Sequence, residues 1–215
     1  MGAVVAVILQ ALLVAREGLP VTSVVTLTVL ACLLGYPGGK VWYLVVNRRP
    51  PREFIWAGAC IQGFLLVALS VVSLGTLVLD LPAGAILDAT APGIFLGMAI
   101  GRPGCFLTGC CAGRPTLSRW GLWSSDRRLG IRRIPVQLYE AVVALTIGVA
   151  GLLLVLTVPT PFPGAVFVGA IAAYTFCRQF LFRLRSQSHT RAGRLITLAV
   201  CALLLLAVVA AYMIG

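Results

Sequence analysis

The residues best able to do chemistry in this chain gather in positions 101–116, which read GRPGCFLTGCCAGRPT. Arg102 lies inside an apolar run, and an ionisable side chain at membrane depth marks a functional site. Its guanidinium offers a planar fork of donors that can grip a phosphate at two oxygens. We therefore expect Arg102 to bind an anion at a point where Pro103 and Gly104 interrupt the helix. The alternative is an arginine whose charged head reaches the interface.

Two further groups of polar residues lie in later apolar runs. Gln137, Tyr139 and Glu140 are bunched at the start of the run that begins at Val136, and an ion pair between Glu140 and an arginine of the preceding basic loop is expected. Tyr174 and Arg178 are four residues apart and so share one helical face. This pair predicts a phosphate clamp, with an arginine that snorkels from a helix end as the alternative.

Three cysteines follow Arg102 closely, namely Cys105, Cys110 and Cys111. A thiol beside a cation ionises more readily, so Cys110 or Cys111 is a candidate nucleophile that carries a lipid group covalently. Packing, a redox role and metal binding are the alternatives. A vicinal pair makes a strained disulfide, whereas a bridge between Cys105 and Cys110 stays open. The remaining cysteines lie in apolar runs, where they are expected to fill space: Cys32, Cys60, Cys177 and Cys201.

The composition decides which elements must position these residues. Hydrophobic residues make up 60% of the 215 and charged residues 11%, whereas roughly a quarter of the residues in a soluble domain are charged. This predicts a single all-α, polytopic integral membrane domain over residues 1–215. Apolar runs long enough to cross roughly 30 Å of hydrocarbon as helices occur at Val21–Val46, Phe54–Leu77, Ala83–Leu107, Val136–Val158, Gly164–Phe182 and Leu195–Met213.

The opening run, Ala3–Ala15, spans only about 20 Å as a helix. We interpret it as the remains of a seventh span, with residues of the natural protein missing upstream, or else as an interfacial helix. Gly97 and Gly101 form a small-xxx-small pair, which favours close packing of the helix over Ala83–Leu107 against a neighbour.

Charge indicates the partner. There are 17 Lys and Arg against 6 Asp and Glu, and the arginines lie in short loops between spans rather than on a separable soluble module, which disfavours nucleic acid and favours anionic phospholipid. These loops share one face, which the positive-inside rule places in the cytoplasm. One loop combines arginines with two interface-preferring tryptophans and is expected to lie on the membrane and recruit headgroups: Trp120, Trp123, Arg127, Arg128, Arg132 and Arg133.

The order of these motifs resembles that of bacterial prolipoprotein diacylglyceryl transferases. The matching segments are Asp-x-x-Ala-Pro at 88–92, Gly-Arg-x-Gly-x-Phe at 101–106, Gly-Arg-x-Thr at 113–116, Pro-x-Gln-Leu-Tyr-Glu-Ala at 135–141 and Tyr-x-x-x-Arg at 174–178. The resemblance implies a multi-pass enzyme of the bacterial inner membrane that needs no cofactor or metal. Such an enzyme transfers a diacylglyceryl group from phosphatidylglycerol to the lipobox cysteine of a prolipoprotein, forming a thioether and releasing glycerol phosphate. The alternatives are a lipid transferase with another thiol or small-molecule acceptor and a non-catalytic protein that binds anionic lipid.

By the same resemblance, Arg102 matches the family's essential arginine, and Tyr174 and Arg178 match the pair on its penultimate helix. Cys105 stands where the family has Asn, and Thr108-Gly109-Cys110 where it has Asn-Gly-Glu. The family turns its phosphate-binding face outward, which we prefer to the inward face that the loop charges indicate. Substrate contacts are expected from Gly104, Cys105, Gly113, Arg114, Gln137, Tyr139 and Glu140, with Gln137 and Glu140 also holding the loop and the following span in register.

Overall fold

The computed structural model describes residues 1–56, 58–123, 130–185 and 191–214. Two of the loop arginines named above, Arg127 and Arg128, lie outside the described residues. The chain divides into two compact units, residues 11–86 and residues 1–10 with 87–215.

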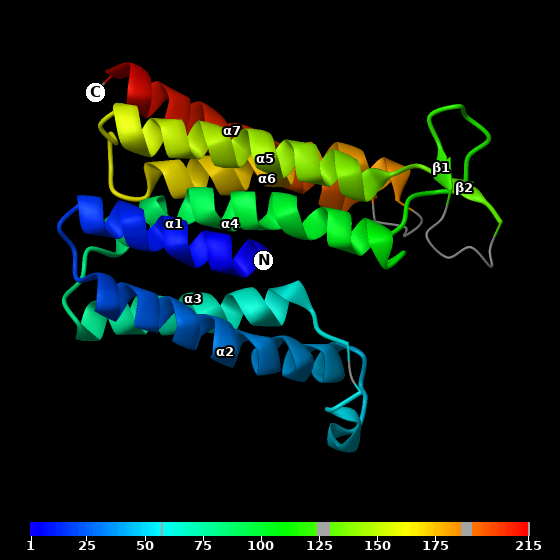
Figure 1. Ribbon diagram of the computed structural model, residues 1–215, viewed down its shortest axis with the longest axis horizontal. Coiled ribbons are helices and arrows are strands. Elements are labelled where there is room, and N and C mark those ends of the chain that lie inside the picture. The colour runs from blue at the N-terminus through cyan, green and yellow to red at the C-terminus, as the bar shows by residue number, and fades with distance from the viewer. Residues whose placement is uncertain (57, 124–129, 186–190, 215) are drawn as a thin grey trace. The chain divides into compact units, whose positions relative to one another are not determined.

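The described residues are almost entirely helical, with one very short hairpin (Figure 1). Five of the helices are long and apolar enough to cross a membrane, and α1 and α3 are shorter apolar helices. The all-α, polytopic membrane fold predicted from the composition is therefore confirmed. The helices are α1 (Gly2–Arg16), α2 (Val21–Val46), α3 (Ile61–Val78), α4 (Ala83–Leu107), α5 (Val136–Thr157), α6 (Ala165–Leu181) and α7 (Arg191–Ile214), with 3₁₀ turns η1 (Pro51–Glu53) and η3 (Phe182–Leu184) and strands β1 (Leu122–Trp123) and β2 (Arg132–Arg133).

The larger unit is a bundle in which α5, α6 and α7 run side by side with α4 (Figure 1). Its core consists of small and aromatic side chains from α4, α5 and α6: Ala91, Phe95, Ala144, Val166, Ala170 and Tyr174. Phe95 and Tyr174 pack ring against ring with centroids 5.5 Å apart. This contact places the hydroxyl-bearing face of α6 against α4, on the side that carries Arg102.

Close packing between α1 and α4 depends on glycine, although not on the predicted pair. A Cβ at Gly93 would lie 2.6 Å from the carbonyl oxygen of Ala6, and one at Gly97 would lie 2.7 Å from that of Gly2. A Cβ at Gly101 would meet nothing described within 4 Å. The small-residue stripe is therefore Gly93 and Gly97, one turn earlier than the sequence suggested.

The end of α4 also corrects an expectation. The helix continues through both Pro92 and Pro103 and ends at Leu107, so Pro103 and Gly104 do not interrupt it. A proline removes one N–H from the helical ladder, but the ladder resumes within a turn, where the N–H of Thr108 bonds to the carbonyl of Gly104. Arg102 consequently projects from a regular helical turn.

In the smaller unit, α2 and α3 form a tight pair whose contact is lined by glycines such as Gly38 and Gly63. The predicted span Phe54–Leu77 begins too early, because α3 starts only at Ile61. Pro50 and Pro51 open the 3₁₀ turn η1 instead. The ammonium of Lys40 on α2 then donates to the carbonyls of Phe54 and Ile55, at 3.2 and 2.8 Å, which holds this segment outside the helix.

Candidate active site

A fully buried carboxylate, that of Glu140 in the first turns of α5, organises the polar interior of the larger unit. Arg102 from α4 contacts Oε2 of Glu140 at 2.9 Å, and Arg185, which follows η3, contacts the same oxygen at 3.1 Å. Arg178 from α6 approaches Oε1 at 3.7 Å. We call Arg102, Arg178 and Arg185 around Glu140 the arginine cluster.

The partners of Glu140 differ from the prediction. The sequence suggested an arginine of the loop before α5, but all three guanidinium groups come from α4, from α6 and from the segment after α6. The loop arginines nearest to α5 are used elsewhere: Arg132 lies over the ring of Trp123, and Arg133 donates to the carbonyl of Gly113 at 3.1 Å. The ion pairs of Glu140 therefore depend on how distant helices pack together and not on proximity in the sequence.

The charge of the arginine cluster is unbalanced. Three guanidinium groups, which stay protonated in proteins, surround one carboxylate, so the cluster carries a net charge of two positive units. It is also incompletely closed, because 27% of the Arg178 side chain is exposed, compared with 14% for Arg102 and 9% for Arg185. An anion can therefore reach the cluster from the side of Arg178, in surroundings where water screens charge poorly.

Tyr174 completes the cluster on the α6 side. Its hydroxyl accepts a hydrogen bond from Nη2 of Arg102 at 3.2 Å, and the guanidinium of Arg178 lies 6.0 Å from its ring centroid. The prediction that Tyr174 and Arg178 share one helical face is confirmed. The same guanidinium carbon lies 5.1 Å from the ring centroid of Phe182. Arg178 therefore has cation–π contacts with two aromatic rings.

Arg185 is held by the segment around Gly113 and Arg114. The N–H of Arg114 donates to the carbonyl of Leu184 at 2.8 Å, and its Nε donates to the carbonyl of Arg185 at 2.9 Å. Gly113 is pressed so closely against Ile134 that a Cβ would collide with the Ile134 carbonyl. Gly113 and Arg114, which the sequence predicts as substrate contacts, therefore support the backbone of Arg185.

Asp88 near the start of α4 anchors α6. Its Oδ2 accepts from the N–H of Gly164 at 2.8 Å and its Oδ1 from that of Phe167 at 2.9 Å. Both donors belong to the N-terminal turn of α6, whose N–H groups have no partner within the helix. This contact fixes α6 relative to α4, and with it Arg178 relative to Arg102.

The cysteine-rich segment is tied to α5 next to the cluster. Nε2 of Gln137 donates to the carbonyl of Cys110 at 2.8 Å, and Gln137 lies one turn before Glu140. Gln137 therefore ties the segment after α4 to the start of α5. Cys110 and Cys111 are exposed, and Cys105 is half-buried. Among the described residues, no group of three or more His, Cys, Asp or Glu side chains is arranged to hold a metal ion.

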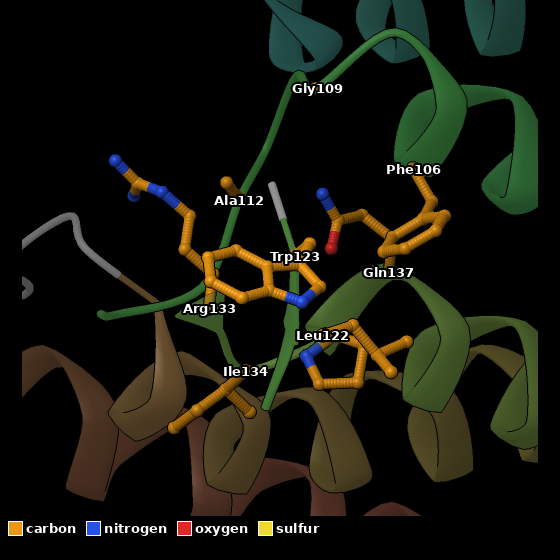
Figure 2. Close-up of a pocket in the computed structure, with 9 residues that line it drawn as sticks. Phe106, Gly109, Ala112, Leu122, Trp123, Arg133, Ile134 and Gln137 are labelled. Atoms are coloured by element: carbon orange, nitrogen blue, oxygen red, sulfur yellow. The ribbon is translucent and has the colours of Figure 1, made fainter. Parts of the chain in front are cut away.

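A small, open pocket lies beside this segment, between the end of α4, the hairpin and the start of α5. Its walls are mostly apolar, and in Figure 2 the amide of Gln137 lies between the rings of Phe106 and Trp123. In Figure 1 the hairpin of β1 and β2 lies beyond the ends of α4 and α5. The exposed indoles of Trp120 and Trp123 are thus presented at the same end as the pocket.

Most of the predicted site residues come together, although their places differ. Arg102, Tyr174, Arg178 and Glu140 meet directly, and Gln137 lies one turn away. Tyr139 has an exposed side chain, and a Cβ at Gly104 would meet nothing described within 4 Å. Sequence reasoning assigned no role to Arg185 or Asp88, although Asp88 opens the Asp-x-x-Ala-Pro motif and Arg185 lies seven residues after Arg178.

Comparison with known proteins identifies the family. The model of the family described as prolipoprotein diacylglyceryl transferase matches residues 1–214. The chain belongs to this family. The family resemblance inferred from the motifs is thereby confirmed.

Several members of the family are similar to this chain. A phosphatidylglycerol–prolipoprotein diacylglyceryl transferase from Cutibacterium acnes is 32% identical over 78% of this chain and 62% of its own length. A phosphatidylglycerol–prolipoprotein diacylglyceryl transferase 2 from Streptomyces coelicolor is 32% identical over 77% of this chain and 57% of its own length. A phosphatidylglycerol–prolipoprotein diacylglyceryl transferase 2 from Clostridium perfringens is 29% identical over 56% of this chain and 51% of its own length. The chain therefore spans about half to three fifths of the length of these relatives.

Proposed function

We propose that this chain transfers the diacylglyceryl group of phosphatidylglycerol to the cysteine thiol of a prolipoprotein at the bacterial inner membrane. The observation that carries the proposal is the arginine cluster, in which three guanidinium groups share one buried carboxylate and leave two positive charges for a ligand. The names of the family and of its members supply the two substrates.

The charge of the cluster fits the course of this reaction. Bound phosphatidylglycerol carries a phosphodiester with one negative charge. The sulfur of the acceptor attacks the glycerol carbon next to the phosphate, so that a carbon–sulfur bond forms as the carbon–oxygen bond breaks. The electron pair of the broken bond stays on the phosphate oxygen, and glycerol phosphate leaves with a second negative charge or takes up the thiol proton. Guanidinium groups already in place stabilise that developing charge more than the charge of the bound lipid.

The residues of the cluster have different roles in this scheme. Arg102 and Arg178 contact the phosphate oxygens, and Tyr174, whose hydroxyl accepts from Arg102, has its own O–H proton to donate to the phosphate. Glu140 is a positioning residue, because Arg102 and Arg185 hold its Oε2 and Arg178 faces its Oε1 at 3.7 Å. The reaction needs no covalent intermediate on Cys110 or Cys111, since a thioether formed there would have to be broken again.

The exposed tryptophans and the arginines of the hairpin are proposed to rest on the lipid surface and to raise the local concentration of anionic headgroups. Trp120 and Trp123 have the amphipathic side chains that favour the membrane interface. Arg119 and Arg132 lie over their rings, at 5.2 and 5.9 Å from the centroids. A guanidinium stacked in this way keeps its donors free to meet lipid phosphate.

The test is a transfer assay with the purified chain in lipid nanodiscs. Labelled phosphatidylglycerol and a synthetic lipobox peptide are supplied, and the thioether product is measured by mass spectrometry. Arg102→Lys keeps the charge but loses the fork and should lower the rate roughly a hundredfold, the cost of one preorganised donor. The matched control is Arg49→Lys, an exposed arginine paired with Glu53, which should leave the rate unchanged. Equal rates for the two variants, or no product from the wild type, would overturn the proposal.

A further inference from the structure

Three thiols meet at the point where α4 ends, and the proposed transfer uses none of them. Cys105 lies in the last turns of α4, and Cys110 and Cys111 follow the helix. Cys110 lies near enough to Cys105 and Cys111 for the three thiols to influence one another's ionisation. The hydroxyl of Thr108 also donates to the sulfur of Cys110, at 3.5 Å. The sulfur of Cys110 is therefore the centre of the group.

Cys110 has the properties of the thiol that reacts first. Its side chain is exposed, and the Thr108 hydroxyl, which stabilises a negative sulfur, lowers the pKa of Cys110 from its ordinary value. The thiolate rather than the thiol is the nucleophile. An oxidant that reaches this end of α4 consequently meets an accessible thiol with enhanced thiolate character.

Cys105 is better placed than Cys111 to react second. A bridge between adjacent residues is strained, and the backbone of Cys111 is already in the left-handed region with φ of 55°. Cys105 and Cys110 are separated by a turn that contains Gly109, whose φ of 74° costs a glycine nothing. This glycine allows the turn to tighten until the two sulfurs bond.

We propose that Cys105 and Cys110 are a reversible dithiol–disulfide pair, a modification site that controls the alignment of the arginine cluster. A hydroperoxide is the oxidant by chemical class. The Cys110 thiolate attacks its oxygen, giving a sulfenic acid and releasing hydroxide or an alcohol. The Cys105 thiol then displaces water from this sulfenic acid, so that two electrons in total pass to the peroxide. A dithiol restores both cysteines by exchange.

The bridge acts on both partners of the shortest ion pair in the cluster. Cys105 lies three residues after Arg102 and so on the same face of α4. The carbonyl of Cys110 is bonded to Gln137, one turn before Glu140 on α5. Drawing the two sulfurs together to a bond of about 2.05 Å therefore strains the support of Arg102 and of Glu140, whose contact is 2.9 Å. The oxidised form should transfer lipid more slowly, an effect that rests on the proposed function.

The chemical part of the proposal is tested without any activity measurement. The nanodisc-embedded chain is fully reduced, treated with hydrogen peroxide, digested and mapped for cross-linked peptides by mass spectrometry. The wild type and Cys32→Ser, which removes an exposed thiol on α2, should both give the link between Cys105 and Cys110, and a dithiol should remove it. Cys105→Ser and Cys110→Ser should lack it. A link between Cys110 and Cys111 in the wild type, or no link, would overturn the pairing.

The transfer assay on the same samples tests whether the disulfide regulates the rate of lipid transfer. Oxidation should lower the rate of the wild type and of Cys32→Ser roughly ten- to a hundredfold, the cost of misplacing a reacting geometry by about an ångström. A dithiol should restore the rate, and Cys105→Ser should lose the sensitivity. If the disulfide between Cys105 and Cys110 is found but the transfer rate does not change, the proposal that this pair regulates transfer is wrong. If the reduced wild type transfers nothing, the proposed function fails while the mapped bridge still stands.

Discussion

The buried carboxylate of Glu140 gives the most demanding test of the site, through the substitution Glu140→Gln. Glutamine has nearly the same shape but carries an NH2 group in place of one acceptor oxygen, so the variant removes the charge and one acceptor. Arg102 and Arg185 now contact Oε2 at 2.9 and 3.1 Å. Without the carboxylate, three guanidinium groups face one another with no counter-charge in a region shielded from water.

The magnitude follows from the burial of the pair. Removing one partner of a buried ion pair costs about 3–5 kcal/mol, because the other charge is left uncompensated. The side chain of Glu140 is 0% exposed and those of Arg102 and Arg185 no more than 14%, so the full range applies. We expect Glu140→Gln to lower the unfolding temperature by roughly 6–20 °C, taking about 2–4 °C per kcal/mol for a chain of this size.

The assay compares two carboxylates by thermal unfolding in the same detergent. Glu53→Gln is the matched control, because Glu53 pairs with Arg49 at 3.7 Å on an exposed surface, where such a pair contributes about 0–1 kcal/mol. Phosphatidylglycerol added before heating should recover part of the stability lost in Glu140→Gln, since its phosphate brings a negative charge to the same cluster. Equal unfolding temperatures for the two variants would refute the view that the carboxylate organises the three arginines.

Three further substitutions test the groups around the cluster. Tyr174→Phe keeps the ring but removes the acceptor of Arg102 and the proposed phosphate donor, so kcat/KM should fall roughly 5- to 13-fold, as expected for a loss of about 1–1.5 kcal/mol. Thr108→Val removes the hydroxyl that lowers the pKa of Cys110. The rate of Cys110 alkylation by iodoacetamide should then fall at neutral pH, and its rise with pH should move upward. Gly113→Ala places a methyl group against a backbone carbonyl and should lower both the unfolding temperature and the transfer rate.

Each of these predictions has a control or a contradicting result. Tyr174→Phe should leave the unfolding temperature nearly unchanged, and an unaltered kcat/KM would exclude the hydroxyl from the site. An alkylation profile for Thr108→Val that coincides with the wild type would mean that the threonine does not influence the thiol. For Gly113→Ala the control is Gly101→Ala, where a Cβ would meet nothing described within 4 Å. Equal effects of the two alanines would argue against a role for Gly113 in supporting Arg185.

Local patterns in the sequence predicted the local features of the fold. Apolar runs predicted the long helices, because hydrocarbon requires every backbone group to be satisfied within the segment. The spacing of Tyr174 and Arg178 predicted a shared face from helical geometry alone. The same reasoning failed at the start of α3, because Phe54, Ile55 and Trp56 are apolar but follow a proline turn. Hydropathy depends only on the side chains and does not detect the backbone constraint that the prolines impose.

The composition of the arginine cluster could not be predicted from local patterns. Glu140 and Arg185 are 45 residues apart, and Arg102 and Tyr174 are 72 apart. Their contacts depend on how α4, α5 and α6 pack, which one sequence does not specify. For Arg185 the sequence offered only its spacing of seven residues from Arg178, and its position rests on hydrogen bonds with Arg114, which belongs to a different segment of the chain.

The anchoring of α6 by Asp88 has a consequence for depth in the membrane. Fourteen positions separate residue 88 from Arg102 on α4, and fourteen also separate residue 164, which the Asp88 carboxylate holds, from Arg178 on α6. At 1.5 Å per residue both arginines lie about 21 Å along their helices from the shared anchor. Because α4 and α6 are joined at the Asp88 contact and the two distances are equal, Arg102 and Arg178 lie at the same height along the bundle. The number of residues between the anchor and each arginine thus sets the position of its guanidinium along the helix. A single residue inserted in either helix would shift that guanidinium by about 1.5 Å along the axis and rotate it by about 100°.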